Sequence, residues 1–182
     1  SSAASDVYKR QVDNVSFDLK PGQLNAVIGN NGCGKTSLIK AIMGLVKHNG
    51  QCQLNEHLLE GISVKKRAQL ISYIPQRNNL TISMTVREVC LLGFNPHMHI
   101  LGGYTTDMIK RADKAIDMVG LKGLYESDFL ALSEGQKQLC ILARTIIEDS
   151  PLLLLDEPDS APVSYTHLRA TRHSLISHAV FC

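Results

Sequence analysis

The segment GNNGCGKT, Gly29 to Thr36, decides the fold class of this chain. It matches the pattern G-x-x-x-x-G-K-[ST], follows the apolar run Leu24 to Ile28, and precedes a stretch whose apolar residues have helical spacing. The buried stripe predicted for that helix consists of Leu38, Ile39, Ile42 and Leu45. A strand, a glycine-rich loop and a helix in this order predict a P-loop, the phosphate-binding turn of an α/β nucleotide-binding fold.

The residue types of this loop suit phosphate binding. Glycines leave room for a close approach of the backbone N–H groups to phosphate, which side chains would block. Lys35 is predicted to reach the β- and γ-phosphates, and the Thr36 hydroxyl to hold Mg²⁺. The full set of predicted phosphate-binding residues is Gly29, Asn30, Asn31, Gly32, Cys33, Gly34, Lys35, Thr36 and Ser37.

A second acidic site follows the run of four leucines from Leu152 to Leu155. A short, uninterrupted apolar run predicts a strand covered on both faces of a parallel sheet, and ligands bind where such strands end. Asp156 is therefore predicted to hold Mg²⁺, and Glu157 to polarise a water that attacks the γ-phosphate. The alternative for two adjacent acids is a solvated turn.

The segment LSEGQ, Leu132 to Gln136, resembles the L-S-G-G-Q signature of ATP-binding cassette (ABC) ATPases, with Glu134 in place of the first glycine. Kinases and GTPases with a P-loop lack this signature. The resemblance implies ATP as the nucleotide and a head-to-tail dimer. In that dimer Ser133, Gly135 and Gln136 would act in trans on the γ-phosphate held by the opposite subunit.

The segment ISYIPQ, Ile71 to Gln76, resembles the Q-loop of the same family. The resemblance implies that Gln76 lies near Mg²⁺ and the attacking water, with a catalytic and a metal-binding role. Helical patterns at residues 85–94 and 106–121 match the family's inserted α-helical subdomain, expected at about 77–131. The expected fold is an α/β P-loop NTPase core with a mainly parallel sheet plus this insert, and it is expected to be incomplete.

Two further stretches, KKRAQLISYIPQ and VREVCLLGFNPH, resemble the ATPase subunits of importers of iron complexes, haem and cobalamin. The resemblance implies ATP hydrolysis that powers import, membrane permease subunits, a second ATPase subunit, and indirectly a periplasmic or lipoprotein solute-binding protein. It implies a cytoplasmic location, peripheral on the inner face of the cell membrane. The alternatives are a soluble ABC ATPase acting on nucleic acid or ribosomes, and a binding-only module, against which Glu157 argues.

Both ends of the chain match translated adapters used in DNA sequencing libraries. Residues 1–11 and 162–170 match without a mismatch, and residues 176–182 match apart from His178. We therefore expect adapter-derived segments at 1–11 and 162–182, a partial ABC ATPase domain at 12–161, and no ATP hydrolysis by the 182-residue chain. The ends contain four basic residues and one acidic residue, so without them the formal net charge changes from +2 to −1. That charge disfavours a nucleic-acid partner.

The remaining composition predicts no other site. No apolar run reaches the roughly 20 residues that a membrane-spanning helix needs. The five cysteines have no C-x-x-C spacing, so neither a disulfide framework nor a zinc site is expected. The scattered histidines are predicted to be exposed loop residues: His48, His57, His97 and His99.

Overall fold

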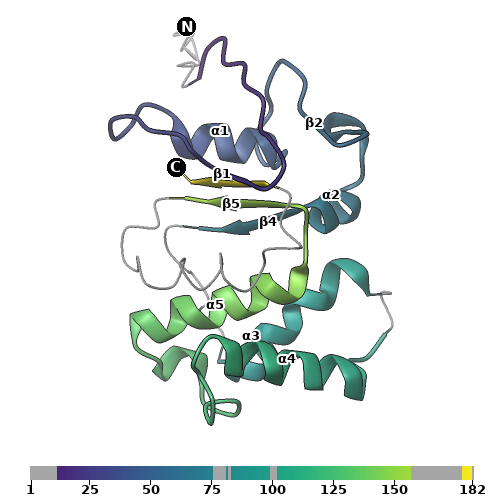
Figure 1. Cartoon of the computed structure of the whole chain (residues 1–182), viewed down its shortest axis with the longest axis vertical. Coiled ribbons are helices and arrows are strands. Elements are labelled where there is room, and N and C mark those ends of the chain that lie inside the picture. The colour runs from purple at the N-terminus through teal and green to yellow at the C-terminus, as the bar shows by residue number, and fades with distance from the viewer. Residues whose placement is uncertain (1–11, 76–80, 82, 99–101, 157–177, 182) are drawn as a thin grey trace, which may run out of the picture.

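The computed structural model describes residues 12–75, 81, 83–98, 102–156 and 178–181 of the chain. These residues form an α/β fold in which a sheet lies between α1 and the helices α3, α4 and α5 (Figure 1). The elements are β1 (Gln23–Ala26), α1 (Lys35–Ile42), β2 (Gln53–Leu54), β3 (His57–Leu58), the 3-10 helix η1 (Leu59–Gly61), α2 (Val64–Leu70), β4 (Ile71–Ile74), α3 (Val86–Leu91), the 3-10 helix η2 (Leu92–His97), α4 (Thr106–Met118), the 3-10 helix η3 (Phe129–Ala131), α5 (Glu134–Glu148), β5 (Leu152–Leu155) and β6 (His178–Phe181).

The main sheet has the strand order β1-β6-β5-β4, and each of its three pairings is parallel. A separate antiparallel pair, β2 with β3, follows α1. Because parallel strands end at one common edge of a sheet, the ends of β4 and β5 lie side by side. The predicted α/β class with a parallel sheet is confirmed.

Strand β5 is buried on both faces, as its leucine run predicts. Leu152 and Leu154 pack in a cluster with Ile39 of α1. Leu153 and Leu155 pack in a second cluster with the helices α3, α4 and α5. Successive side chains of a strand point to opposite faces, so one strand joins two separate cores.

The three helices α3, α4 and α5 pack against one another beside the sheet (Figure 1). Their contact residues include Val86, Ala112, Ile116 and Ile141, none of which is measurably exposed. Of the range predicted for the helical insert, about 77–131, the described residues contain α3, η2, α4 and η3. Within the described part of the chain, no helix has the length and apolarity needed to cross a bilayer.

Strand β6 lies between β1 and β5. It belongs to the segment 162–182, for which the sequence predicts an adapter origin. A β-ladder is made of backbone hydrogen bonds, which many short segments can form, so this pairing does not bear on where the segment comes from. The adapter origin stays a prediction.

Three element boundaries differ from the sequence patterns. The strand expected at Leu24 to Ile28 ends at Ala26, and Leu24 and Ile28 are 66% and 91% exposed. Helix α1 ends at Ile42, because Gly44 has a positive φ of 67°, and Leu45 beyond it is 63% exposed instead of continuing the buried stripe. The helix expected at 85–94 becomes a 3-10 helix after Leu91, in a segment that contains Pro96, which lacks the N–H of a regular helix.

Candidate functional site

The predicted phosphate loop forms a tight turn. Gly32 and Gly34 have φ values of 81° and 105°, a region that L-amino acids with side chains rarely occupy. The Cys33 N–H donates to the Asn30 carbonyl at 3.1 Å across the turn. A Cβ at Gly29 would lie 2.5 Å from the Cys33 sulfur, so a side chain there would require the Cys33 side chain to move. The backbone geometry of the loop therefore explains why glycine occupies these positions of the motif.

Helix α1 starts directly from this loop. Its N-cap residue is Gly34, which provides no capping side chain, and the first turn has no acidic residue. The first backbone N–H groups of a helix have no partner within the helix, and the helix dipole adds partial positive charge at the same place. This end of α1 is therefore suited to an anion.

Lys35 lies over the loop that precedes it. Its ammonium donates to the carbonyl oxygens of Gly29, at 2.9 Å, and of Asn30, at 3.4 Å. These hydrogen bonds place one positive charge at the turn, where phosphate oxygens would compete with the two carbonyls for it.

Thr36 and Asp156 bring the two predicted motifs together. The Thr36 hydroxyl donates to one oxygen of the Asp156 carboxylate at 2.9 Å, across 120 residues of sequence. The Asp156 N–H donates to the Ile74 carbonyl, so β4 holds the acid in place by its backbone. Asp156 is only 5% exposed. A hydroxyl and a carboxylate are both oxygen ligands of the kind Mg²⁺ prefers, so these two residues fit the predicted metal site.

Tyr73 of β4 also contacts this carboxylate, and its hydroxyl donates to the second Asp156 oxygen at 3.2 Å. The sequence patterns did not identify Tyr73 as a site residue. The signal was its place near the C-terminal end of a strand that pairs with the leucine run, but the pairing cannot be read from either segment alone.

The signature residues begin helix α5. The Ser133 side chain accepts from the Gln136 N–H at 3.3 Å, and the Gln136 side chain accepts from the Ser133 N–H at 3.0 Å, which makes a capping box. Gly135 has open space where a Cβ would lie. Glu134 pairs with Lys137 at 2.8 Å, which balances the charge that replaces the usual glycine.

Helix α5 lies on the other side of the sheet from α1 (Figure 1). Within one chain, the structure therefore does not bring Ser133, Gly135 and Gln136 to the phosphate loop. Their role in trans stays a prediction. Gln76 and Glu157 lie outside the described residues, and their roles also stay predictions. In the sequence, each follows the last residue of β4 or β5 by two positions.

A protein-family model described as "ABC transporter" matches residues 12–160, most of the chain. The chain belongs to the ABC transporter family. The "Probable iron chelatin transport ATP-binding protein" of Helicobacter pylori strain 26695 is 32% identical over 152 residues, which are 82% of this chain and 60% of that protein. The "Methionine import ATP-binding protein MetN" of Bacillus subtilis is 36% identical over 169 residues, which are 86% of this chain and 48% of that protein. The chain thus spans about half to three fifths of these two relatives.

A solved structure of an ATP-binding cassette of an ABC transporter, in its ADP conformation, has the same fold. Its TM-score is 0.78 over 94% of this chain and 74% of the other, at 22% sequence identity. Identity this low shows the fold alone. The ABC ATPase fold expected from the motifs is therefore present.

Proposed function

We propose that residues 12–161 are part of the ATP-binding subunit of an ABC importer, which hydrolyses ATP to drive transport. The observation that carries the proposal is the hydrogen bond between Thr36 and Asp156. It unites a phosphate loop and a buried carboxylate at the edge where two parallel strands end. Membership of the ABC transporter family supports ATP as the nucleotide.

The residues of the site have separate proposed tasks. Lys35 exchanges its two loop carbonyls for phosphate oxygens, while the loop N–H groups and the start of α1 hold the rest of the phosphate chain. Thr36 and Asp156 would hold Mg²⁺, which neutralises phosphate charge when it is bound. Tyr73 orients the Asp156 carboxylate through its second oxygen.

Two residues beyond the described part complete the proposed chemistry. Glu157, which directly follows Asp156, polarises the attacking water and accepts a proton from it as the water attacks the γ-phosphate. Gln76 is proposed to contact Mg²⁺ and the same water. Ser133, Gly135 and Gln136, at the capped start of α5, then act on the nucleotide of a second subunit.

The proposed solute is an iron complex, haem or cobalamin. The name of the Helicobacter relative and the two stretches that resemble such importers support this class, whereas the Bacillus relative is named for methionine. We further propose membrane permease subunits as partners, an indirect link to a solute-binding protein, and a location on the inner face of the cell membrane. The alternative, a soluble ABC ATPase acting on nucleic acid or ribosomes, is disfavoured by the formal charge of −1 for residues 12–161.

The first test measures ATP binding by the 182-residue chain with a fluorescent ATP analogue. Hydrogen bonds to charged groups contribute about 1.5–3 kcal/mol each, so Lys35→Ala should weaken binding on the order of 10²-fold. Lys40→Ala is the matched control, because it removes an exposed lysine from the last turn of the same helix. Equal losses in both variants would indicate a general charge effect and contradict the role of Lys35.

The second test concerns hydrolysis in the longer protein that we propose. Glu157→Gln should keep ATP binding and lower turnover on the order of 10²-fold or more, because the water loses its base. Normal turnover would contradict the catalytic role of Glu157.

A pull-down with the same protein should recover a membrane permease, and recovery of RNA would support the alternative. Lys35-dependent phosphate release by the 182-residue chain would contradict the adapter origin of residues 162–182.

A further inference from the structure

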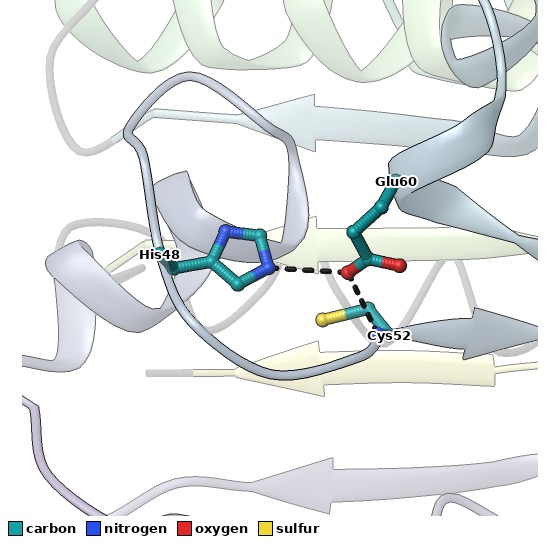
Figure 2. A group of neighbouring side chains, drawn as sticks. All are labelled: His48, Cys52 and Glu60. Carbon is teal, nitrogen blue, oxygen red and sulfur yellow. Dashed lines mark hydrogen bonds and ion pairs between the residues drawn. The ribbon is translucent and has the colours of Figure 1, made fainter.

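His48, Cys52 and Glu60 form a cluster of three potential metal ligands (Figure 2). His48 lies in the loop after α1, Cys52 directly precedes β2, and Glu60 belongs to η1. The His48 Nε2 is 3.1 Å from the Glu60 Oε1, and the Cys52 N–H donates to that same oxygen at 2.8 Å. One potential ligand atom of each residue, a ring nitrogen, the sulfur and a carboxylate oxygen, lies within 4.8 Å of the other two.

The backbone fixes this arrangement. The Leu59 N–H donates to the Cys52 carbonyl at 2.8 Å, so Cys52 is bound to both Leu59 and Glu60. The β2–β3 pair joins the two segments, and Leu54 and Leu59 anchor them with 5% and 2% exposure. Gly50, with a φ of 121°, allows the turn between His48 and Cys52. The three side chains therefore converge because of the hairpin and not through their own contacts alone.

The orientation of the His48 ring suits a metal ligand. Its Nδ1 faces the Val46 carbonyl at 3.5 Å, while its Nε2 faces Glu60 and Cys52 (Figure 2). A backbone carbonyl on one ring nitrogen favours the tautomer that leaves the other nitrogen available to a metal. The Glu60 oxygen that this Nε2 faces, at 3.1 Å, marks the side of the ring on which a cation would lie.

The separation of the nitrogen and the oxygen is close to that in a tetrahedral site. Metal–ligand bonds of about 2.0–2.3 Å place the ligand atoms of such a site roughly 3.3–3.6 Å apart. The nitrogen and oxygen are already 3.1 Å apart, and the sulfur lies within 4.8 Å of both. Binding of one ion by all three residues would bring the sulfur to the shorter of these separations.

We propose that His48, Cys52 and Glu60 bind a divalent transition ion of the zinc class, with water in the fourth position. One sulfur, one imidazole nitrogen and one carboxylate oxygen suit a borderline ion such as Zn²⁺, whereas Mg²⁺ and Ca²⁺ prefer oxygen ligands alone. The bound ion links the loop after α1 to the hairpin and η1. The site is independent of Thr36 and Asp156, so it does not depend on the proposed ATPase function.

The surroundings shift the pKa values of two of these side chains in opposite directions. Burial acts to raise the pKa of the Glu60 carboxyl, but hydrogen bonds from its own and the Cys52 backbone N–H groups and from His48 outweigh it and hold that pKa below its usual value. The carboxylate is thus charged. Burial, followed by the Glu60 charge, raises the pKa of the Cys52 thiol, and a metal ion would release its proton on binding. An ion pair between His48 and Glu60 alone would involve only two of the three groups.

The test is a Co²⁺ titration of the 182-residue chain, followed by competition with Zn²⁺. A sulfur-to-cobalt charge-transfer band that saturates at one equivalent, and that Zn²⁺ removes, is the expected result. Cys52→Ser should abolish the band. His48→Ala and Glu60→Gln should each weaken binding about tenfold or more, since loss of supporting residues alone costs 10–100-fold.

The chain offers a matched control for each ligand. Cys33→Ser removes an exposed thiol, and His57→Ala and Glu56→Gln remove an imidazole and a carboxylate from the neighbouring hairpin. All three should keep the cobalt band. No band in the unaltered chain, a band that persists in Cys52→Ser, or a band lost equally in Cys33→Ser would overturn the proposal.

A second measurement does not depend on whether the variants fold. X-ray absorption of the zinc-loaded, unaltered chain should show one sulfur ligand, with nitrogen and oxygen ligands completing the shell. Coordination without sulfur would overturn the proposal. So would coordination by two sulfurs, because it would point to another thiol pair, such as Cys90 and Cys140 at 3.9 Å.

Discussion

The two sides of the sheet differ in how completely they bury apolar side chains. On one side, the helical layer of α3, α4 and α5 encloses side chains that are completely buried, such as Val89 and Ile141 at 0% exposure. On the other, the phosphate side of β1, the loop 29–36 and α1 leaves Leu24 and Ile28 66% and 91% exposed. Burial of apolar surface is the main stabilising contribution to folding, so the helical layer holds more of the stability.

The helix starts differ in the same way. Helices α3 and α5 begin with complete capping boxes, at Thr85 with Glu88 and at Ser133 with Gln136. Helix α1 begins at Gly34 without a capping side chain. A capping box satisfies the N–H of the third helical residue within the chain, whereas no side chain does this at the start of α1. The start of α1, where the phosphate loop ends, thus lacks the side-chain cap that stabilises α3 and α5.

Thiol labelling should show the largest difference between the two sides of the sheet. Cys33 of the phosphate loop is exposed, while Cys90 of α3 is 0% exposed. Labelling of Cys90 requires opening of the helical layer, and an opening free energy near a global stability of about 5 kcal/mol makes it on the order of 10³-fold slower. Alkylation followed by peptide mass spectrometry measures both rates. Rates within tenfold of each other would mean that the helical layer is open.

The pH of that experiment matters. A hydrogen bond with Cys140, and then burial, raise the pKa of the Cys90 thiol above its usual value. The folded state therefore favours the protonated thiol. This contribution to stability is complete below the unfolded pKa of about 8.5 and is lost as the pH rises from there towards the folded pKa. Labelling near pH 7 keeps this contribution to stability in full. Above about pH 9 the free energy of unfolding should fall.

The same substitution on both sides gives the next largest effect. Ile141→Ala in α5 should lower the free energy of unfolding by about 2–5 kcal/mol, because it leaves a cavity in a closely packed core. Ile28→Ala, at 91% exposure, should change it by no more than about 0.5 kcal/mol. Urea unfolding of the 182-residue chain measures both. A comparable loss in Ile28→Ala would show that the phosphate side is packed against something in solution.

The sequence predicts the local features of both sides well. The glycines of the loop, the covered strand at Leu152 to Leu155 and the helix after Ser133 all follow from short segments with strong patterns. These features depend on residues within a few positions of one another, and their physical causes are visible in the segment itself.

Contacts between distant segments could not be predicted in this way. Tyr73 and Asp156 meet because β4 and β5 pair in one particular register. The histidine and cysteine of the proposed metal site looked scattered, since their spacing matches no zinc motif, and Glu60 joins them only through the β2–β3 hairpin. Local patterns also overestimated the length of α1, where one glycine ended the helix before Leu45.

The smallest expected effect concerns the cap at the start of α5. Ser133→Ala removes the hydroxyl that caps the Gln136 N–H and should lower the free energy of unfolding by about 1 kcal/mol, the usual cost of losing an N-cap. Ser133→Asp is the control, because aspartate caps as well as serine and its charge suits the positive end of the helix dipole. Urea unfolding should therefore place Ser133→Asp with the unaltered chain and Ser133→Ala below it. An equal loss of free energy in both variants would mean that the serine hydroxyl stabilises this turn by something other than capping. The difference between the capped helices α3 and α5 and the uncapped α1 would then no longer explain why α1 alone follows a phosphate loop.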